Sequence, residues 1–109
     1  MSNARREDAV FKALADFRRR RILDLLKKAP RTTGELCERF RDLDRCTVMQ
    51  HIGVLARAEL IICRREGRNR WNYLNVAPFK QIHDRWISVY ASEAVELLGR
   101  LKRDLEEGA

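Results

Sequence analysis

Hydrophobic residues recur every three or four positions along much of the chain, which is the spacing of helices that bury one face. The first such stretch predicts a helix over residues 5–16, with Val10, Phe11, Leu14 and Phe17 on one stripe. The stripe is short, so the helix needs a neighbour to cover it.

A second helix is predicted directly afterwards. Asp16 is a candidate N-cap, and Ile22, Leu25 and Leu26 form the apolar face, with Leu23 beside it. Residues 18–21 are all arginine and fall in the first turn. Four cations at the positive end of a helix dipole are unfavourable, so we expect an external anion to compensate them.

A helix-turn-helix is predicted over residues 32–57. Thr32 and Glu35 have the spacing of a capping box and open a short helix, and Asp44 is the candidate cap of the next one. The apolar face of this later helix consists of Val48, Ile52 and Leu55. Two short helices joined by about four residues are typical of a DNA-binding pair whose second helix reads the major groove.

The opposite face of that second helix is small, polar and lightly charged. It presents Arg45, Cys46, Met49, Gln50 and Gly53. Gln can pair bidentately with adenine and Arg with guanine, while methionine and glycine allow close approach to thymine methyl groups. We therefore predict that these five residues contact bases.

Residues 60–75 read as a β-hairpin. Two β-rich runs flank a turn that contains glycine, and Trp71 and Tyr73 alternate with Arg70, Asn72 and Leu74 in the second run. Arginines crowd the tip of this hairpin, namely Arg64, Arg65, Arg68 and Arg70. A hairpin of this kind after a helix-turn-helix is a wing that can follow a phosphate backbone or reach into the minor groove.

Residues 78–107 predict a long last helix that begins at Pro78. Its apolar stripe is longer than a domain this small can cover alone, so dimerisation is the favoured outcome and folding back on the chain's own core is the alternative. With the helix over 5–16, it supplies the predicted dimer interface. That interface comprises Val10, Phe11, Leu14, Ile82, Trp86, Tyr90, Leu97, Leu98 and Leu101.

Composition narrows the class of protein. The 109 residues contain five Gly and two Pro, which favours one mainly α domain (α+β) over residues 1–109 and excludes a multidomain enzyme. The longest uncharged stretch has eleven residues, too few to span a membrane, and the N-terminus does not resemble a signal peptide. We therefore expect a cytoplasmic protein.

The net charge of +7 is concentrated in one region. Residues 1–75 hold 18 Lys/Arg against 10 Asp/Glu, whereas residues 76–109 hold 5 against 6. A basic surplus confined to the region of the helix-turn-helix and wing is typical of a polyanion binder. Double-stranded DNA is the expected partner, with a winged helix that binds RNA or docks a protein as the alternative.

The chain resembles the ArsR/SmtB group of winged helix-turn-helix repressors, and most closely a branch without obvious metal sites. The matching strings are ALADFRRRRILDLL, TTGELCERF, RCTVMQHIGVLARAELI and RREGRNRWNYL, within residues 9–75. The resemblance implies a homodimer, paired through its first and last helices, that represses transcription from a pseudo-palindromic operator until an inducer releases it. The sequence does not identify the inducer.

Four positions depart from the family pattern. Phe17 and Arg18 stand where Pro-Thr is common, Glu59 replaces a turn glycine that often has positive φ, and Met49 replaces a common serine. We expect mild strain at Glu59. Seven residues are the predicted backbone or minor-groove contacts, namely Arg19, Thr33, His51, Arg64, Arg65, Arg68 and Arg70; for His51 a structural role is equally open.

No metal site or cofactor is expected. Cys37 stands alone where metal-sensing relatives have a cysteine pair, and His83 and Asp84 are adjacent with no second histidine on the last helix. A metal- or thiol-redox-responsive repressor of the same fold is an alternative. The redox case rests on Cys46, which lies near the N-terminus of the recognition helix, where the helix dipole favours the thiolate. No nucleophile motif, paired carboxylates or phosphate loop is present, so the sequence excludes an enzyme.

Overall fold

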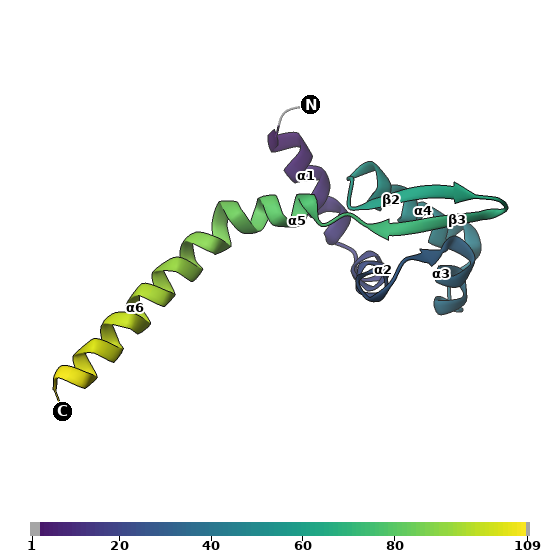
Figure 1. Ribbon diagram of the computed structural model, residues 1–109. Helices are drawn as coiled ribbons and strands as arrows, with labels where there is room; N and C mark the ends of the chain where they lie inside the picture. Colours follow the sequence, from purple (N-terminus) through teal and green to yellow (C-terminus); the bar gives the residue numbers. More distant parts are fainter. Residues whose placement is uncertain (1–2, 109) are drawn as a thin grey trace. The chain divides into compact units, whose positions relative to one another are not determined.

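The computed structural model describes residues 3–108, which form two compact units, one ending at Pro78 and one beginning at Phe79. The helices are α1 (Asn3–Leu14), α2 (Phe17–Lys28), α3 (Thr33–Arg39), α4 (Arg45–Arg57), α5 (Ala77–Ile82) and α6 (Ser88–Glu107), and the π-helical segment His83–Ile87 precedes α6. The strands are β1 (Arg31–Thr32), β2 (Ile61–Glu66) and β3 (Asn69–Leu74) (Figure 1). The predicted mainly α winged helix-turn-helix is confirmed.

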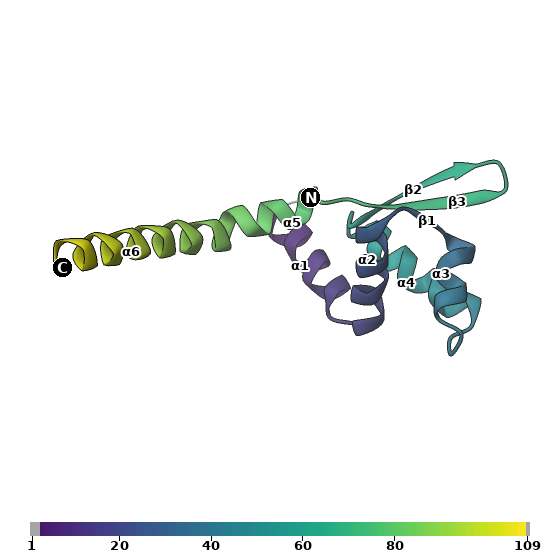
Figure 2. The ribbon, with the colours of Figure 1, turned by 60° about the horizontal axis from the view of Figure 1, so that its bottom comes forward.

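The strands form one antiparallel sheet in the order β1-β3-β2, with helices α2, α3 and α4 along one side of it (Figure 2). The hairpin of β2 and β3 was predicted, but β1 was not. It contains only Arg31 and Thr32, which pair with Asn72 and Trp71. Two residues cannot display a periodic pattern, so the sequence carried no signal for this strand.

The core of the first unit lies between the helices and the sheet. The buried hydrophobic residues are Val10, Ala13, Ile22, Leu23, Leu26, Leu36, Phe40, Val48, Ile52, Leu55, Ala58, Leu60 and Ile61. The predicted buried face of α4 is confirmed. In α2, Leu23 is buried and Leu25 only half-buried, so the apolar face is rotated from the predicted one. Phe17 is largely exposed rather than part of the α1 stripe.

Side-chain caps fix where three helices begin. Asp16 Oδ1 accepts from the amide of Arg18 (2.8 Å), Thr32 Oγ1 from that of Glu35 (3.1 Å) and Asp44 Oδ1 from that of Thr47 (2.7 Å). Each bond satisfies an amide that the first turn of a helix leaves without a backbone acceptor. All three predicted caps are confirmed.

Two residues with positive φ bracket the hairpin's first strand. Gly67 has φ of 62° in the turn between β2 and β3, where glycine carries no steric cost. Glu59 has φ of 63° at the exit from α4. Residues other than glycine are disfavoured in this backbone region, so the strain predicted at Glu59 is present. Its carbonyl accepts from Asn75 Nδ2 (2.8 Å), which ties the base of the hairpin together.

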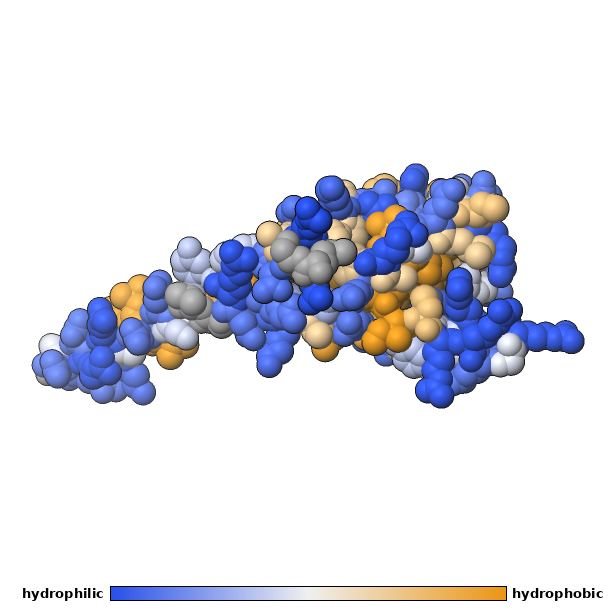
Figure 3. Space-filling view, turned by 90° about the horizontal axis from the view of Figure 1, so that it is seen from above, coloured by the Kyte–Doolittle hydropathy of each residue, from blue (hydrophilic) through white to orange (hydrophobic). Residues whose placement is uncertain are grey.

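The second unit departs from the single uninterrupted helix that the sequence predicted. The segment His83–Ile87 has π-helical hydrogen bonding, and α6 then runs for 20 residues with no side-chain cap. Hydrophobic side chains reach the surface along α6 (Figure 3), including Tyr90, Leu97, Leu98, Leu101 and Leu105. Within residues 3–108, no helix is long and apolar enough to cross a membrane.

Candidate nucleic-acid interface

The outer face of α4 is an open groove of about 550 Å³. Its lining residues are Cys46, Met49, Gln50, Gly53, Val54 and Arg57. Four of the five predicted base-contacting residues are therefore together, and the fifth, Arg45, lies one turn away on the same helix. Because Val48, Ile52 and Leu55 of the same helix are buried in the core, this opposite face points away from the core.

Arg57 belongs to this face but was not among the predicted site residues. A Cβ atom on Gly53 would lie 3.3 Å from Arg57 Nη1, so the glycine leaves the space that the guanidinium occupies. The two residues are four positions apart, which places them on adjacent turns of the same helix face. That spacing was the available signal for Arg57.

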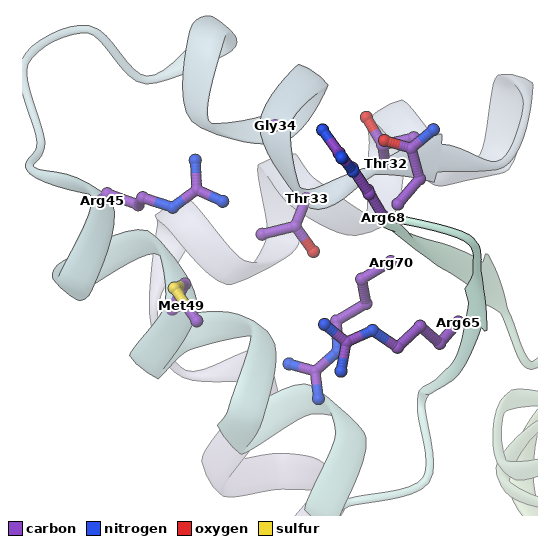
Figure 4. A pocket seen from close by; sticks show the side chains of 9 residues that line it. Thr32, Thr33, Gly34, Arg45, Met49, Arg65, Arg68 and Arg70 are labelled. Carbon is purple, nitrogen blue, oxygen red and sulfur yellow. The ribbon is translucent and has the colours of Figure 1, made fainter.

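A second groove of about 380 Å³ lies between the hairpin and the helix-turn-helix (Figure 4). It is lined by Thr32, Thr33, Gly34, Arg45, Met49, Arg65, Arg68, Asn69 and Arg70. Four of these are arginines and none is acidic. Since guanidinium groups bind phosphate oxygens with two parallel hydrogen bonds, this groove suits a polyanion backbone.

Strand register decides which hairpin arginines reach this groove. Arg65 pairs with Arg70 across the strands, so their side chains leave the same face of the sheet, and both extend toward α4 in Figure 4. Arg64 pairs with Trp71 on the other face, where it forms an exposed ion pair with Glu66 (3.6 Å). Three of the four predicted hairpin arginines are therefore assembled, and Arg64 is not.

Arg19, predicted to bind phosphate, is engaged inside the chain. Its Nε donates to the carbonyl of Ala13 (2.7 Å) and its Nη2 to that of Lys12 (3.1 Å), while Arg20 Nη1 donates to the carbonyl of Leu14 (2.5 Å). These carbonyls lie in the last turn of α1, at the negative end of its dipole, and that of Lys12 also accepts from the amide of Ala15. Two of the four arginines in this run therefore have internal partners at the end of α1, and an external anion for the run stays a prediction.

Thr33 and His51 are also turned toward the protein. Thr33 is buried, and its hydroxyl oxygen accepts from Asn72 Nδ2 (3.2 Å). His51 is half-buried, its Nδ1 lies 3.3 Å from Arg19 Nη1, and its Nε2 is buried without a hydrogen-bond partner. Thr33 lines the hairpin groove with its hydroxyl bonded to Asn72, and the contact of His51 with Arg19 supports the structural alternative for that histidine.

The cysteines stand apart from one another as free thiols, with Cys37 half-buried and Cys46 and Cys63 exposed. Burial of the Cys63 sulfur raises the pKa of that thiol, and the charge of Arg70 only partly offsets the effect. Among residues 3–108, no three His, Cys, Asp or Glu side chains gather where they could hold a metal ion. The sequence also predicts that iodoacetamide alkylates Cys46 faster than Cys37 or Cys63 at neutral pH, and this stays a prediction.

Comparison with known proteins places these features in a family. Residues 14–64 match a family model described as a helix-turn-helix domain. The transcriptional repressor SdpR of Bacillus subtilis is 39% identical over 66 residues, which cover 61% of this chain and 72% of that protein. The uncharacterized HTH-type transcriptional regulator YuzN of the same organism is 36% identical over 87 residues, covering 74% and 95%.

Solved structures agree with the sequence relatives. The crystal structure of the ArsR family transcriptional regulator RHA00566 has a TM-score of 0.70 at 28% identity, and the match covers 90% of this chain and 95% of that one. The chain therefore belongs to the ArsR-type winged helix-turn-helix transcriptional regulators, which are DNA-binding proteins and not enzymes.

Proposed function

We propose that this regulator is a homodimeric repressor in which α4 reads bases in the major groove while the hairpin holds the adjacent phosphate backbone. The observation that carries the proposal is that the two grooves meet at Met49, which lines both of them. A lightly charged helix face beside an arginine groove matches the division of a protein–DNA interface into base readout and backbone positioning.

Base selection is assigned to the outer face of α4. Gln50 can accept from and donate to the major-groove edge of adenine, and Arg45 can donate twice to guanine. Met49 is 41% exposed and offers an apolar contact for a thymine methyl group. Cys46 and Gly53 keep the remaining surface small enough for close approach.

Backbone binding is assigned to the hairpin arginines that line the 380 Å³ groove, with Arg57 added from the neighbouring one. Arg65, Arg68 and Arg70 come from the hairpin, where nothing acidic lines the groove. Release of condensed counterions makes each phosphate contact favourable and sensitive to salt. Arg19, Thr33, His51 and Arg64 drop out of the predicted contact set because their side chains point elsewhere or are already bonded.

The partner for the second unit is assigned as a second copy of the chain. Tyr90, Leu97, Leu98 and Leu101 are exposed on α6, and Phe11 is exposed on α1. Val10, predicted at the dimer interface, is instead buried in the core of its own chain. A two-fold pair would present two copies of α4 to half-sites of a pseudo-palindromic operator, about 34 Å or one duplex turn apart. We expect the repressor to act in the cytoplasm.

The test separates base reading from backbone binding. With DNA from upstream of its own gene, Gln50→Ala should reduce discrimination between the operator and a scrambled duplex by about 1–3 kcal/mol, whereas Arg68→Ala should weaken binding to both and flatten the salt dependence. Arg65→Ala has a matched control in Arg64→Ala, the neighbouring arginine on the other face. Equal effects of Gln50→Ala and Arg68→Ala, or tighter binding to structured RNA than to the duplex, would contradict the proposal.

A further inference from the structure

Asn72 is the polar residue at the centre of the sheet. It lies on β3, between Cys63 of β2 and Arg31 of β1 in the strand register, and its exposed fraction is 0%. Its side chain makes three hydrogen bonds: Nδ2 donates to the Arg31 carbonyl (3.2 Å) and to Thr33 Oγ1 (3.2 Å), and Oδ1 accepts from Cys63 Sγ (3.2 Å). One side chain thus joins β1, β2 and the start of α3.

These bonds define one orientation of the amide. The Arg31 carbonyl can only accept, so the nitrogen of Asn72 must face it, and the oxygen must then face the thiol. Both amide hydrogens are used. Burial keeps the pKa of the Cys63 thiol raised, so the group remains protonated and able to donate at neutral pH. The hydrogen bonds of Asn72 therefore fix the orientation of its amide, in addition to the packing around the buried side chain.

Asn72 is the hairpin's anchor, because its buried hydrogen bonds lie next to the arginines of the 380 Å³ groove. On the face that looks toward α4, the pair Cys63/Asn72 is followed toward the tip by the pair Arg65/Arg70. Residues 64–70 are all exposed, so the arm beyond the Cys63/Asn72 pair has no buried side chain of its own. Figures 1 and 2 both show the tip extending beyond α3 and α4. The last fixed point before the groove arginines is Asn72.

We propose that Asn72 is a positioning residue for DNA binding: by bonding β3 to the start of α3, it sets where Arg65 and Arg70 stand above the groove. This inference rests on the proposed function of the hairpin arginines. An apolar residue of similar size would fill the space but would not select one register or one tilt, because hydrophobic contact has no direction.

The experiment is a pair of double-mutant cycles on operator binding. Asn72→Leu alone should weaken operator binding about tenfold. In the wild type, Arg65→Ala should weaken operator binding about tenfold as well, whereas in the Asn72→Leu background it should weaken binding less than about threefold. Gln50→Ala should cost the same in both backgrounds, because α4 does not depend on Asn72. An undiminished Arg65→Ala penalty would overturn the proposal, and so would an equal shrinkage of the Gln50→Ala penalty, which would indicate general loosening.

A second measurement needs no DNA. Hydrogen exchange of the amides in residues 64–70 should accelerate at least about tenfold in Asn72→Leu, while exchange in α4 stays unchanged. Cys63→Ser, which keeps a donor, should behave like the wild type, and Cys63→Val should shift part of the way toward Asn72→Leu. Unchanged exchange at the tip would refute the anchor. A wild-type protein that binds no duplex would instead refute the proposed function, and the exchange result would still decide the role of Asn72.

Discussion

Helices α4 and α6 carry hydrophobic residues at the same spacing but differ completely in how those residues are covered. In α4, Val48, Ile52 and Leu55 are 1%, 3% and 0% exposed, and Asp44 caps the helix. In α6, Leu97, Leu98 and Leu101 are 66%, 64% and 54% exposed, and no side chain caps it. Periodicity identifies the face that must be covered, but it does not identify the partner that covers it.

This difference predicts that substitutions in the two apolar faces change two different properties, chain stability and self-association. Loss of a side chain from α4 should reduce the stability of each chain at any concentration. Loss of a side chain from α6 should change association, which depends on concentration. The predictions below begin with the largest expected effect.

Replacing Leu98 and Leu101 by glutamate should dissociate the dimer. Four leucines leave the interface of the pair, each worth about 1.5–3 kcal/mol when buried, so self-association should weaken by more than about a thousandfold. Sedimentation equilibrium at micromolar concentration measures it. Ser92→Glu, on the opposite side of α6, is the control and should remain dimeric. A wild-type chain that sediments as a monomer would contradict the comparison itself.

Leu55→Ala in α4 should lower the free energy of unfolding by about 2–5 kcal/mol, because a fully buried leucine leaves both a lost contact and a cavity. Urea unfolding followed by circular dichroism at two protein concentrations gives the value. Val54→Ala, at the half-buried neighbouring position, should cost much less. Equal losses at the two positions would show that α4 is not held by this face.

Glu59→Gly should stabilise the chain by about 0.5–1 kcal/mol, since glycine adopts the φ of 63° without the steric cost that a Cβ atom brings. Thermal unfolding provides the measurement. Glu66→Gly, in the extended β2 strand, makes the same chemical change where no positive φ exists and should be neutral or destabilising. Destabilisation by Glu59→Gly would mean that the Glu59 side chain contributes something beyond its backbone conformation.

The cap of α4 should make stability sensitive to acid. The hydrogen bond from the Thr47 amide lowers the pKa of Asp44 below its ordinary value of 3.8. The contribution of Asp44 is therefore fully present above pH 3.8 and is lost as the pH falls through the lower folded value. Asp44→Asn keeps a cap without a charge, so its stability should fall less between pH 6 and pH 2.5. Parallel urea titrations test this, and identical pH profiles would rule it out.

Much of the fold was predictable because its signals are local. Asp44, Thr32 and the stripe of α4 each act within a few residues, and a capping or burial pattern of that range is visible in the sequence. The outer face of α4 followed directly, because a helix with one buried side presents the other. The residues that line the 550 Å³ groove were found in this way, except for Val54 and Arg57.

The errors involve contacts between distant residues. Arg19 was assigned to DNA because a cation run has no visible partner in sequence, whereas the carbonyls of Lys12 and Ala13 become its partners only when α1 and α2 meet. Asn72 was recognised only as part of the alternation in the second run of the hairpin, and its bonds to Arg31 and Thr33 form only when β1 pairs with β3. Hydrogen bonds of this kind depend on tertiary structure, and charge or alternation alone does not predict them.

The opposite orientations of Arg64 and Arg65 constrain the number of residues in the hairpin. Side chains alternate across a strand, so deleting Arg64 would turn Arg65 outward and bring Glu66 over the helices, and deleting Trp71 would turn Arg70 outward. Substitutions in the Gly67–Arg68 turn change one contact at a time, whereas a change of length would exchange the two surfaces. Among relatives, we therefore expect the length of this arm to vary less than the identity of its residues.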